Sequence, residues 1–229
     1  MKQAFWLEKW EKNEIGFHLD AAHPWLVKVT TELNFKAKQT VFVPLCGKTH
    51  DIDFLLEQGC NVVANELSEL AVQALFKRLE VTPQVTQWQT ASADKTAKQY
   101  QAGALTVFVG DYFQLTPSEI RKVYGDDVSW IYDRAALVAL PTEMRHQYAQ
   151  LLTTLCPKAS QLLMTLDYPQ QQMPGPPFSV TVSEVTDHYA SDYQIEQLKQ
   201  QDIIDKEPRF KQRGLTEFNQ RMYLLTPKT

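Results

Sequence analysis

The stretch Thr40-Val41-Phe42-Val43-Pro44-Leu45-Cys46-Gly47-Lys48-Thr49 decides the fold class of this chain. Its first four residues are β-branched or aromatic, which is typical of a short buried strand. A loop follows over residues 44–49, and the apolar spacing from Asp51 to Gln58 predicts a helix that Thr49 caps and Gly59 ends. Residues 40–58 therefore predict one strand–loop–helix unit.

The same alternation continues along the chain. Asn61 to Asn65 predicts a second strand, and Ser68 is the expected N-cap of a second helix. Residues 82–103 are polar and weakly patterned, so a loop and a hairpin both remain open there. Strands that alternate with helices predict a doubly wound, parallel α/β sheet, in which ligands bind beyond the carboxyl ends of the strands. The later predicted elements are strands over 105–109, 128–132, 161–166 and 221–225, and helices over 141–155 and after a Pro-rich loop at 173–178.

The first residues of the chain mix aromatic and charged side chains. Trp6 and Trp10 are four residues apart, so they share one face of a predicted helix. This mixed character predicts a lid that orders over a bound ligand. No repeat, charge block or long linker divides the sequence, and we expect a single domain over residues 1–229, with an N-terminal helical lid over 1–36 and an α/β core over 37–229.

Charge and composition narrow the classes of partner. The 229 residues include 23 Lys and Arg against 27 Asp and Glu, for a net charge of −4. Proteins that bind duplex nucleic acid usually carry a basic excess, so we expect no nucleic-acid partner. The charge and the lack of a long amphipathic seam favour a monomer. The longest apolar run, Ala135 to Leu140, is too short for a membrane helix, and the N-terminus lacks the apolar region of a signal peptide.

Cysteine and histidine usage predicts neither a disulfide framework nor a metal site. The three cysteines are far apart in the sequence, and the five histidines have no metal-ligand spacing. A reduced, cytoplasmic setting is therefore expected. Cys46 lies in the loop after the first strand and is interpreted as a packing residue.

Gly47 and Glu66 form the first candidate binding pair. Gly47 permits close backbone approach to a ligand, and Glu66 ends the second strand, where its two oxygens suit the hydroxyls of a ribose. The alternative, a solvated carboxylate at a strand end, stays open on spacing alone. The loop has one glycine where a dinucleotide fingerprint has three, and Leu45 and Cys46 fill the space that a pyrophosphate needs. It therefore suits a nucleoside without phosphates, such as S-adenosylmethionine, better than NAD or FAD.

Six motifs together resemble the thiopurine S-methyltransferase family of the bacterial type, over nearly the whole chain. They are Trp6-Leu7-Glu8-Lys9-Trp10, Phe17-His18, Pro44-Leu45-Cys46-Gly47-Lys48, Asn65-Glu66-Leu67-Ser68, Asp133-Arg134-Ala135-Ala136-Leu137 and Pro174-Gly175-Pro176-Pro177-Phe178. The resemblance implies the Rossmann-like class I methyltransferase fold with a mostly parallel seven-strand sheet. It also implies methyl transfer from S-adenosyl-L-methionine to the sulfur of thiopurines or other aromatic and heterocyclic thiols.

The resemblance also assigns residues to roles. It implies cofactor contacts from residues at six places along the chain and an acceptor pocket formed by Phe17, Arg134 and Arg209. No catalytic base is expected, because aromatic thiols ionise readily. The implied cofactor-binding residues are Trp10, Leu45, Gly47, Glu66, Asp111, Tyr112 and Arg134.

Three other functions remain open at this stage. The acceptor of a methyltransferase of this type could be a small selenium or tellurium species, as in metalloid detoxification. A non-catalytic S-adenosylmethionine-binding protein would need only the cofactor residues, whereas Phe17, Arg134 and Arg209 imply a second ligand. An NAD-dependent oxidoreductase is disfavoured by the glycine-poor loop.

Overall fold

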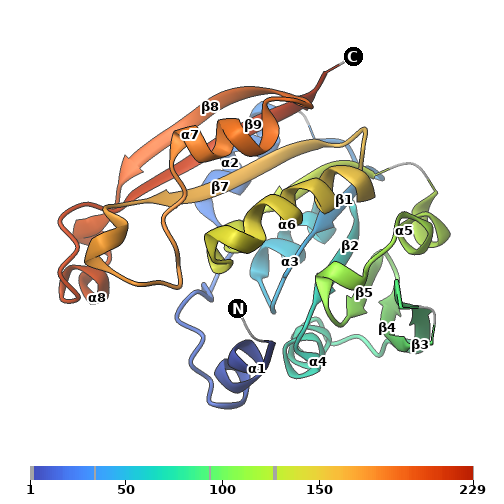
Figure 1. Cartoon of the computed structure of the whole chain (residues 1–229). Coiled ribbons are helices and arrows are strands. Elements are labelled where there is room, and N and C mark those ends of the chain that lie inside the picture. Colours follow the sequence, from blue (N-terminus) through green and yellow to red (C-terminus); the bar gives the residue numbers. More distant parts are fainter. Residues whose placement is uncertain (1–2, 34, 93, 126–127, 229) are drawn as a thin grey trace. The chain divides into compact units, whose positions relative to one another are not determined.

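The computed structural model of the chain describes residues 3–33, 35–92, 94–125 and 128–228. The chain divides between Trp130 and Ile131 into two compact units, which are described separately here (Figure 1). The single domain expected over 1–229 stays a prediction. Parts of the predicted lid (residues 1–2 and 34) and of the polar segment (residue 93) lie outside the described residues.

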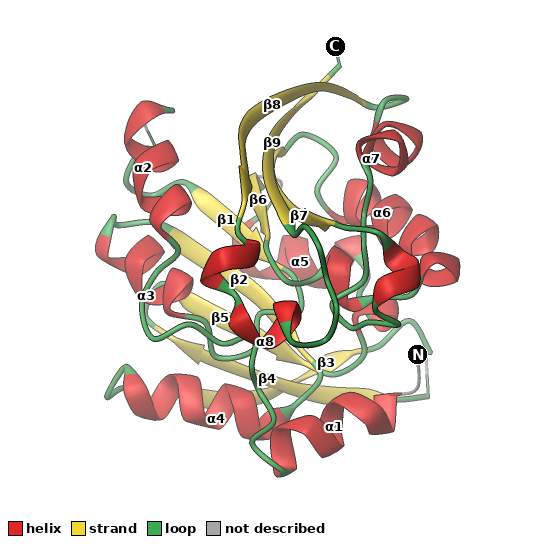
Figure 2. Cartoon of the chain, turned by 90° about the vertical axis from the view of Figure 1, so that its left-hand side faces the viewer, coloured by secondary structure: helices red, strands yellow, loops and turns green. Residues whose placement is uncertain are grey.

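The first unit contains a five-strand sheet with parallel strands at its centre. Parallel pairing joins β1 to β2, with Thr40 opposite Asn61, and β2 to β5, with Glu66 opposite Val109. The carboxyl ends of these three strands therefore meet at one edge. The strand order is β3-β4-β5-β2-β1, visible in Figure 2, with bounds β1 Thr40–Val43, β2 Asn61–Glu66, β3 Gln84–Gln89, β4 Thr96–Ala102 and β5 Leu105–Val109.

Helices begin where capping residues predict them. Thr49 accepts the N–H of Asp51 at the start of α3, and Ser68 accepts the N–H of Ala71 at the start of α4. The predicted alternation of strand and helix over residues 40–109 is thus confirmed. The helices of this unit are α1 Gln3–Glu11, α2 Pro24–Glu32, α3 His50–Glu57, α4 Glu69–Arg78 and α5 Pro117–Tyr124, with a 3₁₀ turn η1 at Tyr112–Gln114.

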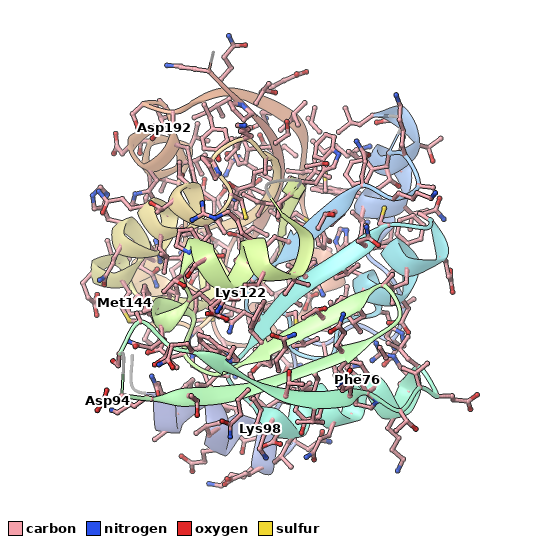
Figure 3. The ribbon with its side chains drawn as sticks, turned by 90° about the vertical axis from the view of Figure 1, so that its right-hand side faces the viewer. Phe76, Asp94, Lys98, Lys122, Met144 and Asp192 are labelled. Carbon is pink, nitrogen blue, oxygen red and sulfur yellow. The ribbon has the colours of Figure 1, made fainter. Side chains whose placement is uncertain are left out.

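The polar segment 82–103 forms a hairpin, which is one of the two alternatives that the sequence left open. Strands β3 and β4 pair antiparallel, and Trp88 packs edge-on against Phe108 at 5.6 Å between ring centroids. The Trp88 indole N–H donates to the Val109 carbonyl at 3.2 Å. A groove of about 350 Å³, lined largely by glutamines, lies against this hairpin and α5, near Lys122 in Figure 3. None of the predicted site residues lines it.

The second unit is built on an antiparallel sheet in the order β7-β9-β8. Strand β6, Val128–Asp133, crosses the boundary at Trp130 and brings Asp133 into this unit. The remaining strands are β7 Ser160–Asp167, β8 Tyr193–Asp202 and β9 Asn219–Pro227, and the helices are α6 Thr142–Leu155, α7 Val182–Tyr189 and α8 Pro208–Lys211. Shorter 3₁₀ turns are η2 Leu137–Ala139, η3 Gln170–Gln172 and η4 Ile204–Lys206.

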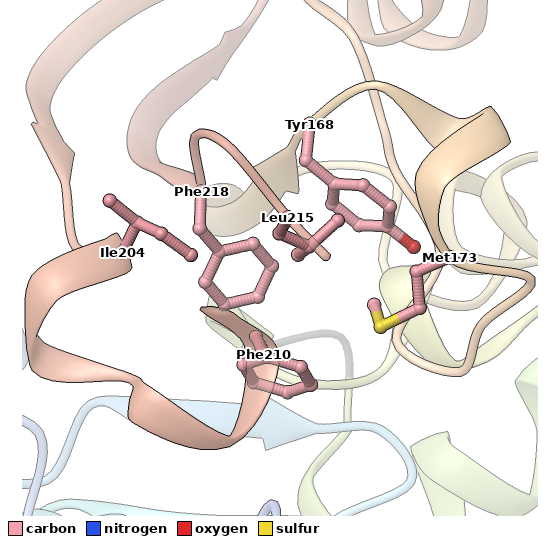
Figure 4. Packing of buried hydrophobic residues seen from close by; sticks show 6 residues of the cluster. All are labelled: Tyr168, Met173, Ile204, Phe210, Leu215 and Phe218. Carbon is pink, nitrogen blue, oxygen red and sulfur yellow. The ribbon is translucent and has the colours of Figure 1, made fainter. Parts of the chain in front are cut away.

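A small hydrophobic cluster in this unit joins the segment after β7 to the segment between β8 and β9. Its two segments are also linked by the N–H of Thr216, which donates to Gln172 Oε1 at 3.1 Å. The cluster therefore fixes α8, which carries Arg209. Its members, shown in Figure 4, are Tyr168, Met173, Ile204, Phe210, Leu215 and Phe218.

The described residues contain nine strands, whereas the family resemblance implied seven. The hairpin β3–β4 adds strands in a segment whose Gln- and Thr-rich sequence lacks an apolar pattern, because its side chains are mostly exposed. Within the described ranges, no helix has the length and apolar character needed to cross a membrane.

Candidate active site

The loop after β1 has a tightly held backbone. Leu45 and Gly47 both lie in the left-handed region, with φ of 45° and 55°. A residue with a Cβ adopts this region at a cost of about 1–2 kcal/mol, so surrounding contacts must hold Leu45 there. One such contact is the N–H of Cys46, which donates to the carbonyl of Asn65 at 2.9 Å. We refer to residues 44–49 as the cofactor loop, after the role that the sequence predicts for it.

Glu66, the last residue of β2, connects the cofactor loop to the start of α4. Its Oε2 accepts the N–H of Gly47 at 2.7 Å, and its Oε1 accepts the N–H of Ser68 at 2.8 Å. The side chain is buried, and this burial raises the pKa of the carboxyl, whereas the N–H groups that it accepts lower the pKa. Each carboxylate oxygen has two lone pairs, so Glu66 keeps capacity for a further hydrogen-bond donor while backbone N–H groups hold it in place.

Asp111 and Tyr112 lie just beyond the end of β5, the strand that pairs with β2. Asp111 Oδ1 accepts the N–H of Phe113 at 3.0 Å and caps the turn η1. Its Oδ2 accepts a hydrogen bond from Gln3 Nε2 of α1 at 2.8 Å. Tyr112 is buried. The structure thus brings Asp111 to the same sheet edge as Glu66 and links it to the N-terminal helix.

The N-terminal segment covers the cofactor loop with aromatic rings. Two atoms of the Trp10 ring, Cζ2 and Cη2, lie 3.0 and 3.3 Å from the position that a Cβ on Gly47 would take. Phe17 packs edge-on against Trp10 at 5.7 Å and against Trp6 at 5.9 Å between ring centroids. All three rings are half-buried, and α1 has no fully buried side chain. We refer to Trp6, Trp10 and Phe17 as the aromatic cluster.

The two predicted arginines belong to the second unit. Arg134 directly follows β6, is half-buried and precedes Ala135, whose φ is 59°. Arg209 lies on α8, where its guanidinium carbon is 4.6 Å from the centroid of the Phe210 ring and its Nε donates to Glu207 at 3.1 Å. The structure therefore places Arg134 at a strand end, as predicted, and Arg209 on a short helix above the hydrophobic cluster.

A family model described as thiopurine S-methyltransferase matches residues 1–228. The chain belongs to this family. A Shewanella baltica thiopurine S-methyltransferase is 43% identical over 231 residues and covers 100% of both chains. A Pseudomonas paraeruginosa relative with the same name is 39% identical over 98% of this chain and 99% of its own.

Solved structures of methyltransferases share the fold. An S-adenosylmethionine-dependent methyltransferase from Anabaena variabilis aligns with a TM-score of 0.61 and 12% identity, and covers 99% of this chain and 95% of its own. The Burkholderia thailandensis 1,6-didemethyltoxoflavin-N1-methyltransferase, solved with S-adenosylhomocysteine, has a TM-score of 0.62 and 14% identity, and covers 98% of this chain and 87% of its own. The predicted class I methyltransferase fold is confirmed.

Family membership makes this protein an S-adenosylmethionine-dependent methyltransferase. The residues of this chain fit that cofactor. Because Gly47 has no Cβ, its backbone and the Trp10 ring approach closely, and the Glu66 carboxylate is held beside them with acceptor capacity for a further donor. The loop lacks the glycine-rich motif that would indicate a dinucleotide cofactor instead.

The structure also shows contacts of two motif residues to which the sequence assigned no role in the site. Asn65 is fully buried, and its Nδ2 donates to the carbonyls of Phe108 at 3.0 Å and Gly110 at 3.1 Å, so it ties the end of β2 to the end of β5. His18 stacks on His50 of α3 at 5.6 Å between ring centroids, next to the aromatic cluster in sequence. The sequence does offer a signal for Asn65, because a polar residue at the end of an apolar strand is unusual. It offers no signal for the stacking of His18 on His50, because these residues are far apart in the chain.

Cys46 is held as a neutral thiol. Burial raises its pKa well above the ordinary value, and its Sγ lies 3.4 Å from the Gly47 carbonyl, to which the S–H donates. A thiol in that state is a poor nucleophile, because the thiolate is the reactive form. The structure supports the interpretation of Cys46 as a packing residue.

Proposed function

We propose that this methyltransferase transfers the methyl group of S-adenosylmethionine to the sulfur of thiopurines or other aromatic and heterocyclic thiols. The observation that carries this proposal is the aromatic cluster, which packs against the cofactor loop through the contact of Trp10 with Gly47. Flat aromatic rings suit a flat heterocyclic acceptor. The relatives at 39–43% identity are named as thiopurine S-methyltransferases, which supports the same class of acceptor.

We propose cofactor contacts from Trp10, Leu45, Gly47 and Glu66. In this proposal, Glu66 accepts the ribose hydroxyls, and the left-handed conformation of Leu45 exposes its backbone to the methionine part of the cofactor. Asp111 and Tyr112 contribute on the adenine side, beyond the end of β5. Trp10 faces the sulfonium, to which its ring is attracted by a cation–π interaction.

The mechanism requires orientation more than acid–base chemistry. When bound, S-adenosylmethionine supplies an electrophilic methyl group on a sulfonium cation. Trp10 and Phe17 exclude water and hold the acceptor sulfur in line with that methyl group. Arg134 and Arg209 stabilise the acceptor as an anionic thiolate by their positive charge. We name no catalytic base, because an aromatic thiol loses its proton readily in solution.

The test is methylation of matched acceptors. Purified protein is incubated with S-adenosylmethionine and a thiopurine, with the same purine carrying oxygen in place of sulfur as control, and products are identified by mass. We expect methylation on sulfur only. Methylation of selenite or tellurite species with no turnover of any aryl thiol would establish the metalloid alternative instead.

The cofactor assignment has its own test. Glu66→Ala removes charge-assisted hydrogen bonds to the ribose, a loss of roughly 1.5–3 kcal/mol in all, so the affinity for S-adenosylhomocysteine should fall about ten- to a hundred-fold. Calorimetry measures this affinity directly. An unchanged affinity would remove Glu66 from the cofactor site.

A further inference from the structure

Arg78, the last residue of α4, extends its side chain to the cofactor loop. Its Nη1 donates to the Lys48 carbonyl at 2.5 Å, and its Nη2 donates to the Thr49 carbonyl at 3.1 Å. Its Nε donates to Asp53 Oδ1 of α3 at 3.0 Å, and Nη2 also contacts Asp53 Oδ2. The side chain is 23% exposed, so most of the guanidinium is shielded from water. A cation in the last turn of a helix commonly interacts favourably with the dipole of its own helix. The groups that accept hydrogen bonds from Arg78, however, all belong to other elements.

The two carbonyls that Arg78 holds directly follow Gly47. The Gly47 N–H donates to Glu66, so the cofactor loop is fixed from one side by a carboxylate and from the other by a guanidinium. The left-handed residues of this loop are Gly47, which Glu66 holds directly, and Leu45, two residues before it; their conformation persists only if the surroundings hold it. The planar guanidinium has donors at fixed spacing, so it can hold two successive carbonyls together in a way that an ammonium group cannot.

We propose that Arg78 is a positioning residue for cofactor binding. By holding the Lys48 and Thr49 carbonyls, it keeps the cofactor loop in the conformation that presents Gly47 and Glu66 to the nucleoside. This inference rests on the assignment of that loop and of Glu66 to the cofactor under the proposed function. Arg78 itself acts through the loop backbone.

The test compares Arg78→Met and Arg78→Lys with Asp53→Asn. Asp53→Asn keeps an oxygen acceptor for the Nε of Arg78 and leaves both carbonyl contacts in place, so it is the matched control. Calorimetry with S-adenosylhomocysteine should show a roughly ten-fold weaker affinity for Arg78→Met, equivalent to about 1.4 kcal/mol, and less than about three-fold for Asp53→Asn. Arg78→Lys should resemble Arg78→Met more than wild type, since one ammonium cannot span the two carbonyls.

Two further measurements separate positioning from general stability. The KM for S-adenosylmethionine should rise in both Arg78 variants, while the KM for the acceptor thiol stays at the wild-type value. Amide hydrogen exchange at residues 46–49 should become faster without ligand, while exchange in β1 and β2 stays slow. A loss of folding alone would lower the apparent kcat with both KM values unchanged, and would speed exchange at all of these amides together.

The outcomes distinguish this inference from the proposed function. Glu66→Ala is measured in parallel: if it weakens binding and Arg78→Met does not, the inference is overturned and the cofactor site stands. Equal losses of affinity in Asp53→Asn and Arg78→Met would show that binding depends on the ion pair and not on the carbonyl contacts. This result would also overturn the inference. If Glu66→Ala binds as wild type, the cofactor assignment itself fails.

Discussion

Asp133, the residue before the proposed acceptor-binding Arg134, has a buried carboxylate that should make the stability of the protein depend on pH. The side chain is fully buried at the end of β6. Its Oδ2 accepts the O–H of Tyr148 on α6 at 2.8 Å, and its Oδ1 accepts the N–H of Leu137 at 3.2 Å. These bonds only partly offset the burial, which raises the pKa of Asp133 from 3.8 to about 6. On α7, the same negative charge contributes to a raised pKa of Tyr189.

Because the pKa of Asp133 is raised in the folded state, its contribution to the free energy of unfolding changes with pH in a defined direction. Between about pH 4 and about pH 6 the folded chain binds more protons at Asp133 than the unfolded chain does, so acidification stabilises the fold through this group. The stabilisation is fully present below the unfolded pKa and is lost as the pH rises through about 6. A difference of about two pKa units corresponds to ~3 kcal/mol in the free energy of unfolding.

Asp133→Asn removes the titration and keeps the shape. Urea unfolding of wild type and Asp133→Asn is compared from about pH 8 to about pH 4.5, and the difference between the two proteins cancels all other titrating groups. We expect wild type to gain ~2 kcal/mol relative to the variant as the pH falls across this range, because the rest of the ~3 kcal/mol appears only below the unfolded pKa. Tyr148→Phe removes a hydrogen bond to the charged form, so the pH at which wild-type-like stabilisation appears should move upward. If the difference in the free energy of unfolding between wild type and Asp133→Asn stays constant with pH, the raised pKa of Asp133 is refuted.

Three other predictions concern the site. Gly47→Ala would place a Cβ 3.0 Å from Trp10 Cζ2, at a residue whose φ is 55°. We therefore expect calorimetry to show weaker binding of S-adenosylhomocysteine. Unchanged binding would contradict the close packing of Trp10 against Gly47. Amide exchange over residues 4–20 should slow when S-adenosylhomocysteine is added, because α1 has no fully buried side chain and is predicted to order over bound ligand. Equal protection with and without ligand would show that the segment is fixed structure. Arg134→Lys keeps the charge and loses the planar fork, so kcat/KM should fall about ten-fold or more with little change in melting temperature. The reverse pattern would make Arg134 a structural residue.

Local signals in the sequence predicted the elements that determine where the site lies. The β-branched run Thr40–Val43 and the caps Thr49 and Ser68 act over a few residues, because a strand needs a buried apolar run and a helix needs its first N–H groups satisfied. The same local reasoning placed Gly47 in the loop and Glu66 at a strand end. The hydrogen bond between these two residues is consistent with that placement. The cofactor role of the pair stays a prediction.

Contacts between distant segments could not be predicted in the same way. Residues 82–103 lack an apolar pattern because most side chains of β3 and β4 are exposed, and the hairpin is anchored by contacts with distant residues: the packing of Trp88 against Phe108 and the pairing of β4 with β5. Arg78 looked like any cation in a last helical turn, since its acceptors lie 25–30 residues away in sequence. The raised pKa of Asp133 likewise arises from burial, which no spacing reveals. The sequence by itself determined the strands that have a buried apolar run and the helices that have a cap and an apolar face. The tertiary structure decided the form of the polar segment 82–103 and which polar groups share one loop or one buried environment, because hydrogen bonding and desolvation depend on neighbours that only the folded chain brings together.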